Sequence, residues 1–227
     1  MKTANIGHRG AKGHLPENTL ASFQKAIDLG ANGIELDVHL SADGQVIVMH
    51  DETIDRTTDG KGAVKQQPLA VLKTHRIDFQ FEIPTLSEVF DLVDRKVLVN
   101  IELKVFETAE PVVLLIEKYV LEKGWQYSDF LISSFDWLAL EKVRALHAEI
   151  PLGVLTSTDL DLAIAFAKVI NAETIHPYFH LLTDENVARM QTQNVKVYTW
   201  TVNEFEDLHR VTSLGVDGII TDFPDRL

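Results

Sequence analysis

Two apolar segments of the sequence carry acidic side chains where a buried strand would be expected. Residues 33–39 read Gly-Ile-Glu-Leu-Asp-Val-His, and alternation at period two puts Glu35 and Asp37 on one face. A second apolar segment repeats the pattern, with Glu102 and Lys104 on a shared face. Burying an ionised carboxylate costs free energy unless it is paired or holds a metal. The pattern therefore indicates carboxylates that are paired or bind a metal ion.

A bound cation would allow all three carboxylates to stay ionised. If Glu35, Asp37 and Glu102 converge from neighbouring strands, their mutual repulsion requires a positive charge nearby. Oxygen ligands suit a hard divalent ion, so the pattern predicts one Mg²⁺ or Ca²⁺, with Mn²⁺ as a further choice. For any one acid alone, the alternative is a buried salt bridge with Lys104 or Arg9 that has only a structural role.

Two histidines stand out from the nine in the chain. His8 and His50 each follow an apolar segment, and each precedes a charged residue, Arg9 or Asp51. Because imidazole titrates near neutral pH, such a pair can supply a general base and a general acid. The alternative for each is a buried imidazole held by hydrogen bonds. We expect His39 to support the site without contacting substrate.

Three further residues are candidates for binding substrate. Arg9 offers a bidentate fork and Lys104 a point charge, so both can bind a phosphate group. Trp200 ends another apolar segment, and it is equally compatible with a pocket wall and with core packing. The stretch Gly7-His8-Arg9-Gly10 does not match a dinucleotide-binding or P-loop pattern. The residues therefore predict a metal and phosphate site.

The elements that must position these residues alternate between strands and helices. Strand–helix alternation implies a parallel sheet, and eight units in 227 residues predict an α/β fold, a (β/α)₈ TIM barrel. Active sites of such barrels lie at the C-terminal ends of the strands, where the candidate residues stand. The predicted strands are 4–7, 34–39, 97–103, 130–133, 152–155, 174–176, 196–201 and 218–221. The predicted helices begin after Asn18 or Thr19 and at 87, 109, 136, 160, 184 and 204.

One segment interrupts this rhythm. A turn at 41–44 and a short strand at 45–49 follow the second barrel strand, and residues 51–84 after them are polar. Only a short apolar pattern around 69–72 breaks the polar run. We expect residues 51–84 to form a small inserted lobe over the strand ends, within a single domain that spans 1–227.

Composition restricts the partners and the location. The chain has 34 acidic and 21 basic residues and a formal net charge of −13, which argues against nucleic acid and against an anionic membrane. A small anionic substrate is still compatible, because Arg, Lys and a metal can reverse the potential inside a cleft. The absence of cysteine excludes disulfides and zinc–thiolate sites. No apolar run approaches the ~18 residues of a membrane span, so we expect a cytoplasmic protein. The sequence leaves the oligomeric state open between a monomer and a homodimer.

Several motifs, taken together, resemble the glycerophosphodiester phosphodiesterase family in its cytoplasmic bacterial form. The resemblance is dense in the first half of the chain and looser in the second. The motifs that carry it are Gly7-His8-Arg9-Gly10-Ala11, Pro16-Glu17-Asn18-Thr19, Ile34-Glu35-Leu36-Asp37-Val38, His50-Asp51, Arg56-Thr57-Thr58, Glu102-Leu103-Lys104, Ser133-Ser134-Phe135, Trp200-Thr201-Val202-Asn203 and Gly218–Pro224.

The resemblance implies a reaction and roles for the residues. It implies a divalent metal on Glu35, Asp37 and Glu102, with His8 and His50 as the acid–base pair. The implied reaction hydrolyses a small-molecule glycerophosphodiester, such as glycerophosphocholine or glycerophosphoethanolamine, to glycerol 3-phosphate and an alcohol. One rival is a lysophospholipase D-like activity, which would need an exposed apolar rim for an acyl chain. Another is a barrel that binds phosphodiesters without hydrolysing them, which the presence of both histidines disfavours.

Overall fold

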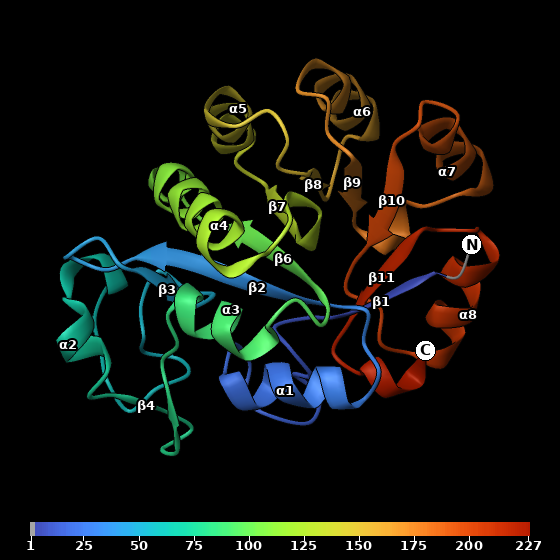
Figure 1. Cartoon of the computed structure of the whole chain (residues 1–227). Helices are drawn as coiled ribbons and strands as arrows, with labels where there is room; N and C mark the ends of the chain where they lie inside the picture. The colour runs from blue at the N-terminus through green and yellow to red at the C-terminus, as the bar shows by residue number, and fades with distance from the viewer. Residues whose placement is uncertain (1–2) are drawn as a thin grey trace.

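Eight parallel strands form a closed barrel in the computed structural model, which describes residues 3–227. The barrel strands are β1 (Ala4–Gly7), β2 (Gly33–Leu40), β6 (Leu98–Leu103), β7 (Phe130–Ser134), β8 (Leu152–Thr156), β9 (Thr174–Pro177), β10 (Lys196–Thr199) and β11 (Gly218–Thr221). Each pairs with the next in this order, and β1 pairs with both β2 and β11. This pairing confirms the predicted (β/α)₈ fold (Figure 1).

Helices connect the barrel strands and cover the outside of the barrel (Figure 1). They are α1 (Leu20–Asp28), α3 (Leu86–Val93), α4 (Ala109–Lys123), α5 (Trp137–Leu146), α6 (Leu160–Val169), α7 (Asp184–Gln191) and α8 (Phe205–Ser213). Thr19 is the cap of α1, since its side chain accepts a hydrogen bond from the Ser22 N–H. Asn18, the other cap candidate, has a left-handed φ of 57°, and its side chain donates a hydrogen bond to Asp37 instead. Within residues 3–227, no helix is long and apolar enough to cross a bilayer.

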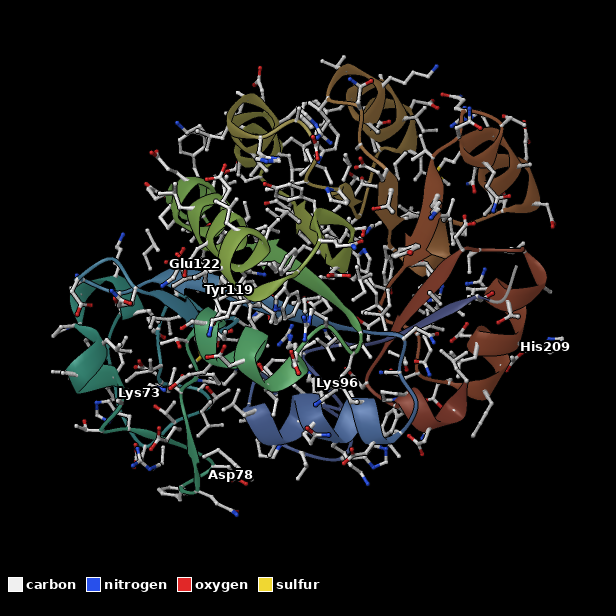
Figure 2. The ribbon with its side chains drawn as sticks, in the orientation of Figure 1. Lys73, Asp78, Lys96, Tyr119, Glu122 and His209 are labelled. Atoms are coloured by element: carbon white, nitrogen blue, oxygen red, sulfur yellow. The ribbon has the colours of Figure 1, made fainter. Side chains whose placement is uncertain are left out.

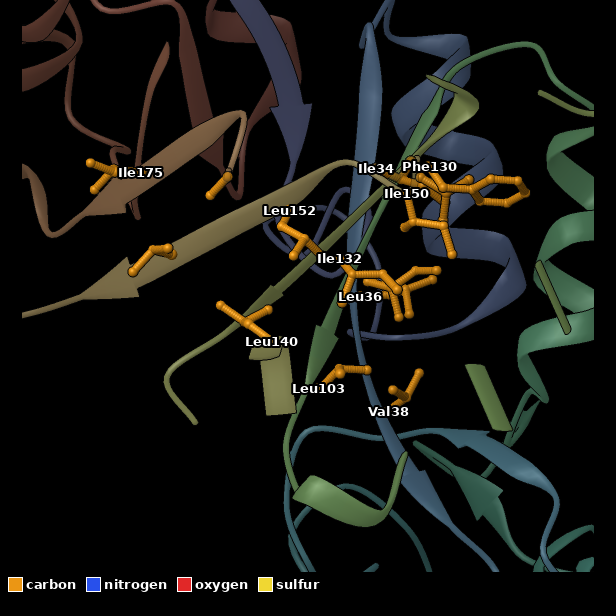
Figure 3. Packing of buried hydrophobic residues seen from close by; sticks show 14 of the residues in the cluster. Ile34, Leu36, Val38, Leu103, Phe130, Ile132, Leu140, Ile150, Leu152 and Ile175 are labelled. Carbon is orange, nitrogen blue, oxygen red and sulfur yellow. The ribbon is translucent and has the colours of Figure 1, made fainter. Parts of the chain in front are cut away.

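The main hydrophobic core lies between the barrel and these helices. Ile34, Leu36 and Val38 of β2 are fully buried in it, and Figure 3 shows them beside Leu103 and Ile132 of the neighbouring strands. Burying one such side chain contributes about 1.5–3 kcal/mol. Because successive side chains of a strand point to opposite faces, this outward packing directs the intervening acidic residues of β2 into the barrel.

The segment between β2 and α3 has a small core of its own. It contains β3 (Val46–Val48), α2 (Leu69–Leu72), β4 (Arg76–Ile77) and β5 (Phe81–Glu82). Figure 1 shows α2 and β4 in teal beside the barrel. Its buried cluster, separate from the main core, is Ile47, Met49, Ile54, Val64, Leu72, Ile77 and Ile83. Lys73, labelled in Figure 2, lies on this segment, and its Nζ is 2.6 Å from Glu88 Oε2 on α3. That ion pair connects the segment to helix α3.

Two positions near the site differ from the expected arrangement. His50 was expected to follow a strand that ends at the catalytic face, but β3 is antiparallel to the barrel strands. His50 still reaches the site, because β2 extends beyond the rim of the barrel and β3 runs back along β2, with Val48 opposite Val38. The strand predicted at 196–201 ends at Thr199, so Trp200 lies in the loop after β10.

Candidate active site

The three predicted metal ligands meet inside the mouth of the barrel. Asp37 on β2 pairs in register with Glu102 on β6, so the two side chains leave adjacent strands at the same level. Glu35 lies one inward-facing position earlier on β2. One carboxylate oxygen from each residue lies within 4.8 Å of the others. Glu35 and Asp37 are buried, and the Glu102 side chain is 13% exposed. The fold therefore brings these carboxylates together in a water-poor environment.

Burial and repulsion shift the ionisation of this cluster. Burial raises the pKa of Glu35 well above its usual value, and the charges of Asp37 and Glu102 raise it further. Burial and the charge of Asp37 also raise the pKa of Glu102 to about 7. Burial acts the same way on Asp37, but Lys104 and Arg9 outweigh it and lower the pKa of that carboxyl. A further cation would stabilise the ionised form of all three acids, and oxygen donors of this kind fit a hard divalent ion.

Arg9 and Lys104 lie against the same carboxylates. Lys104 Nζ is 2.7 Å from Glu102 Oε1 and 3.4 Å from Asp37 Oδ1. Arg9 has a left-handed φ of 51°, which is uncommon for a side chain of this size. In this conformation its backbone N–H donates to Glu35 Oε2 at 2.9 Å, and its Nε lies 3.4 Å from Asp37 Oδ2. Both cations are thus held in place at the cavity wall, where they can attract an anion.

His8 and His50 have matching surroundings. His8 Nδ1 is 2.6 Å from Asp222 Oδ1, and His50 Nδ1 is 2.6 Å from Asp51 Oδ1. A carboxylate that accepts from Nδ1–H leaves Nε2 of the neutral ring with a lone pair. Burial lowers the pKa of His8, and the hydrogen bond with Asp222 partly opposes this change. Each histidine is therefore oriented on one side and available for proton transfer on the other.

One cavity of about 120 Å³ joins the predicted residues. All eight of them except Asp37 line it, and Asp37 lies just behind the wall, 1% exposed. Trp200 lines the cavity, and its Nε1–H donates to the His176 carbonyl at 2.8 Å. Its ring packs edge-on against Phe135 with centroids 5.4 Å apart. The arrangement can bind a phosphate ester, compensate its charge and exchange protons with it from two positions.

Several supporting residues were missed at the level of sequence. Glu17 Oε1 accepts from Arg9 Nη1 at 2.8 Å and from Arg56 Nη2 at 2.7 Å, while Arg56 Nε donates to Asp51 Oδ2 at 2.6 Å. This chain of ion pairs links the phosphate candidate Arg9 to the partner of His50. Glu17 and Arg56 stand in motifs, but nothing in their local sequence indicates that they meet.

Two more supporting residues have no usable local signal. Asn18 Nδ2 donates to Asp37 Oδ2 at 2.9 Å, although its position before α1 is typical of a helix cap. Asp222 pairs with His8 across 214 residues of sequence, so only closure of the barrel brings them together. His39, expected to support the site, lies beside His50, with its Nε2 3.2 Å from the His50 carbonyl oxygen.

Comparison with known proteins gives a consistent result along the chain. The model of the glycerophosphoryl diester phosphodiesterase family matches residues 8–226. A glycerophosphodiester phosphodiesterase of Caldanaerobacter subterraneus subsp. tengcongensis is 39% identical over 240 residues, covering 100% of this chain and 97% of that protein.

Solved structures agree with these matches. An Oleispira antarctica phosphodiesterase in complex with the product sn-glycerol-3-phosphate has a TM-score of 0.89 and 30% identity, covering 100% of this chain and 95% of that one. A glycerophosphodiester phosphodiesterase from Thermotoga maritima has a TM-score of 0.85 and 29% identity, with 99% and 97% coverage.

Proposed function

Because this chain belongs to the glycerophosphoryl diester phosphodiesterase family, we propose that it hydrolyses glycerophosphodiesters such as glycerophosphocholine or glycerophosphoethanolamine. The products would be glycerol 3-phosphate and an alcohol. As a member of this family the chain is an enzyme, a glycerophosphodiester phosphodiesterase. The observation that carries the proposal is a single cavity with two aspartate-paired histidines and a buried cluster of carboxylates and cations. The product complex of the Oleispira relative supports a small-molecule substrate.

Glu35, Asp37 and Glu102 would hold one divalent cation, Mg²⁺, Ca²⁺ or Mn²⁺. The fit rests on three carboxylates within 4.8 Å of one another, of which Glu35 and Glu102 have pKa values raised by burial and by neighbouring charge. When bound, the ion would neutralise the carboxylates and polarise a phosphoryl oxygen.

Arg9 and Lys104 would compensate the remaining charge of the phosphate as it grows in the transition state. Both are already fixed by ion pairs, Arg9 with Glu17 and Lys104 with Glu102. Groups that are oriented in advance need little reorganisation during the reaction, which is the main source of electrostatic catalysis. Trp200 would close the side of the pocket.

The two histidines would move the protons. At Nε2, one accepts a proton from the nucleophile, either a water or the neighbouring 2-hydroxyl of the glycerol unit. As the new P–O bond forms, the bond to the leaving alcohol breaks, and the other histidine, protonated on both ring nitrogens beforehand, donates its Nε2 proton to that oxygen. With the 2-hydroxyl as nucleophile this step gives a cyclic phosphate, which water would then open to glycerol 3-phosphate with the two histidines in exchanged roles. Asp222 and Asp51 would keep Nδ1–H of each ring in place.

The direct test is an assay of purified protein on glycerophosphocholine, with Mg²⁺, Ca²⁺ or Mn²⁺ added and products followed by phosphorus NMR. We expect glycerol 3-phosphate to appear, with no turnover after exhaustive chelation and recovery when the ion is restored. Full turnover by protein shown to be metal-free by elemental analysis would overturn the metal site. Absence of turnover with every ion would overturn the proposed reaction.

Variants of the histidines test the acid–base roles. His8→Ala and His50→Ala should each lower kcat by roughly 10²–10⁴-fold while the fold and metal content are kept. A p-nitrophenyl ester, whose leaving group needs no proton, should rescue the variant that lacks the acid more than the one that lacks the base. Near wild-type kcat in both variants on glycerophosphocholine would show that the histidines are structural.

The remaining partner assignments stay predictions. The net charge of −13 supports the expectation that the protein binds neither nucleic acid nor a membrane stably. Location in the cytoplasm stays a prediction from the sequence, and the choice between a monomer and a homodimer stays open.

A further inference from the structure

Asn203 belongs to a motif of the sequence but has no role in the proposed reaction so far. It ends the motif Trp200-Thr201-Val202-Asn203, in the loop between β10 and α8. Its side chain contacts Asp222, the carboxylate that pairs with His8. Among the residues that the structure describes, neither Asn203 nor Asp222 lines the cavity. Asn203 can therefore act on the reaction through Asp222 and His8, without touching substrate.

The side-chain amide of Asn203 holds Asp222 by two groups at once. Its Nδ2 donates to Asp222 Oδ2 at 2.8 Å, and its Oδ1 accepts from the Asp222 backbone N–H at 2.9 Å. The same Oδ1 accepts from Thr221 Oγ1 at 3.2 Å. An amide carries a donor and an acceptor side by side, which this pair of contacts requires. A carboxylate in its place would turn a second negative oxygen toward Asp222.

These contacts leave the other oxygen of Asp222 for His8. Asp222 Oδ1 lies 2.6 Å from His8 Nδ1, while Oδ2 is occupied by Asn203. The Asp222 carbonyl accepts from the Gly13 N–H at 2.9 Å, and the His8 N–H donates to the Thr221 carbonyl at 2.8 Å. Burial raises the pKa of Asp222, but the hydrogen bonds from His8 and Asn203 outweigh it and lower that pKa. The carboxylate is thus ionised and fixed, with one oxygen turned to the imidazole.

The loop that carries Asn203 is itself held to the segment after β11. Arg226 Nη1 donates to the Asn203 carbonyl at 2.6 Å, and the Arg226 guanidinium lies 3.8 Å from the centre of the Phe223 ring. The Val202 N–H donates to the Ile220 carbonyl at 3.0 Å. A residue orients another group well when its own conformation is fixed by its neighbours. Asn203 meets this condition.

The surroundings of His50 differ on this point, which provides an internal reference. Asp51, the partner of His50, is held by a cation, since Arg56 Nε donates to Asp51 Oδ2 at 2.6 Å. Removing the Asn203 amide should therefore disturb His8 and leave His50 as it is.

We propose that Asn203 is a positioning residue that orients His8 through Asp222. This inference rests on the proposed function, in which His8 exchanges a proton at Nε2. By keeping Asp222 Oδ1 aligned with Nδ1–H, the amide fixes the plane of the imidazole and presents Nε2 to the cavity. Without the amide, the carboxylate can rotate and His8 is held less often in the productive orientation. Small losses of orientation lower the rate of such reactions strongly.

The first test compares the kinetics of Asn203→Ala with those of Asn186→Ala. Asn186 is the matched control, because its amide also accepts from a backbone N–H, that of Thr183 at 3.0 Å, and donates to an oxygen, the Leu181 carbonyl at 2.7 Å. Asn203→Ala should lower kcat on glycerophosphocholine by roughly 10- to 100-fold, the range of one hydrogen bond to a charged group. KM should stay near the wild-type value, and Asn186→Ala should keep both constants.

A double-mutant cycle shows whether Asn203 acts through Asp222. In an Asp222→Ala background, Asn203→Ala should change kcat little, because the group on which it acts is already absent. Asn203→Asp is the second variant if Asn203→Ala does not fold. It keeps the shape of the side chain and the acceptor for the Asp222 N–H, but it loses the donor to Oδ2 and should lower kcat at least as much.

Proton NMR of the protein without substrate follows the orientation of His8 independently of activity. The Nδ1 protons of His8 and His50 each lie in a 2.6 Å hydrogen bond to a carboxylate and should give low-field signals. Asp222→Ala assigns the His8 signal by removing it. Asn203→Ala should shift or broaden that signal and leave the His50 signal unchanged, whereas Asn186→Ala should change neither.

The outcomes separate this role from the proposed function. If the wild type hydrolyses glycerophosphocholine but Asn203→Ala keeps its kcat, or lowers kcat equally with and without Asp222, the positioning role is wrong and the reaction stands. An unchanged His8 signal in Asn203→Ala would also overturn the role. If the wild type does not hydrolyse the diester, the proposed reaction fails, and the NMR comparison still decides whether Asn203 orients His8.

Discussion

Replacing Glu102 by glutamine should have opposite effects on stability with and without metal. Burial and the charge of Asp37 raise the pKa of Glu102 from 4.5 to about 7. An acid with a raised folded-state pKa binds its proton more tightly in the folded protein, so stability is lost as the pH rises from the unfolded pKa through the folded one. Glutamine resembles the protonated acid and cannot ionise. Glu102→Gln should therefore stabilise the metal-free protein at pH 8 and leave it nearly unchanged at pH 5.

The size of the effect follows from the shift. The rise in the pKa of Glu102 from 4.5 to about 7 corresponds to about 3 kcal/mol, most of which is lost between pH 5 and pH 8. For a chain of this length this equals about 5–10 °C in Tm. Burial lowers the pKa values of His8, His39 and His176, which gives both proteins a slope of the opposite sign. The quantity to follow is therefore the difference in Tm between variant and wild type.

The assay is thermal unfolding in a chelator at pH 5, 6, 7 and 8, repeated with millimolar Mg²⁺ or Ca²⁺. With the ion present the order should reverse, because the wild type keeps three carboxylates and the variant keeps two. Glu107→Gln, at an exposed position after β6, is the control for loss of one negative charge. A difference in Tm that does not change with pH would refute the claim that burial destabilises ionised Glu102. An equal gain from metal in both proteins would refute its role as a ligand.

Two further predictions concern the parts around the site. Asp222→Asn should lower kcat, by no more than the roughly 10²–10⁴-fold expected for losing His8. It should also lower the pKa of His8 in the pH profile, because Asp222 raises that pKa. An unchanged profile would contradict this pairing. Residues 60–75 can be replaced by two glycines, because Asp59 and Arg76 already lie side by side. The Asp59 N–H donates to the Arg76 carbonyl at 3.1 Å. We expect this shortened lobe to change KM while the barrel still unfolds cooperatively, and loss of folding would show that the lobe belongs to the core.

Much of the site could be predicted because strand geometry is local. Alternation along β2 was sufficient to place Glu35 and Asp37 on the inner face, opposite the apolar residues that pack on the helices. The order of strands and helices then predicted that β6 lies beside β2, which brings in Glu102 and Lys104. These inferences needed only the period of the pattern and the rule that parallel strands end at one edge.

The residues that were missed depend on contacts that no local pattern encodes. His176 and Ser133 lie in short strands of apolar appearance, and only the closed barrel shows that they face one cavity. Asn18 occupies a position that favours a helix cap, yet its left-handed backbone leaves capping to Thr19. Local sequence preferences correctly predicted the helix. They could not show that Asn18 would hydrogen-bond to Asp37 while Thr19 capped the helix.

The two histidines reach the cavity from different elements, so different structural changes should disturb their orientation. His8 and Asp222 follow β1 and β11, which pair with Gly7 opposite Thr221, so closure of the barrel itself aligns them. His50 and Asp51 follow the hairpin strand β3, and Asp51 is held by Arg56 from the lobe. Loosening the lobe should therefore disturb the orientation of His50 and leave that of His8 intact. The proposed acid–base pair thus combines one group positioned by closure of the barrel with one positioned by the hairpin and by Arg56.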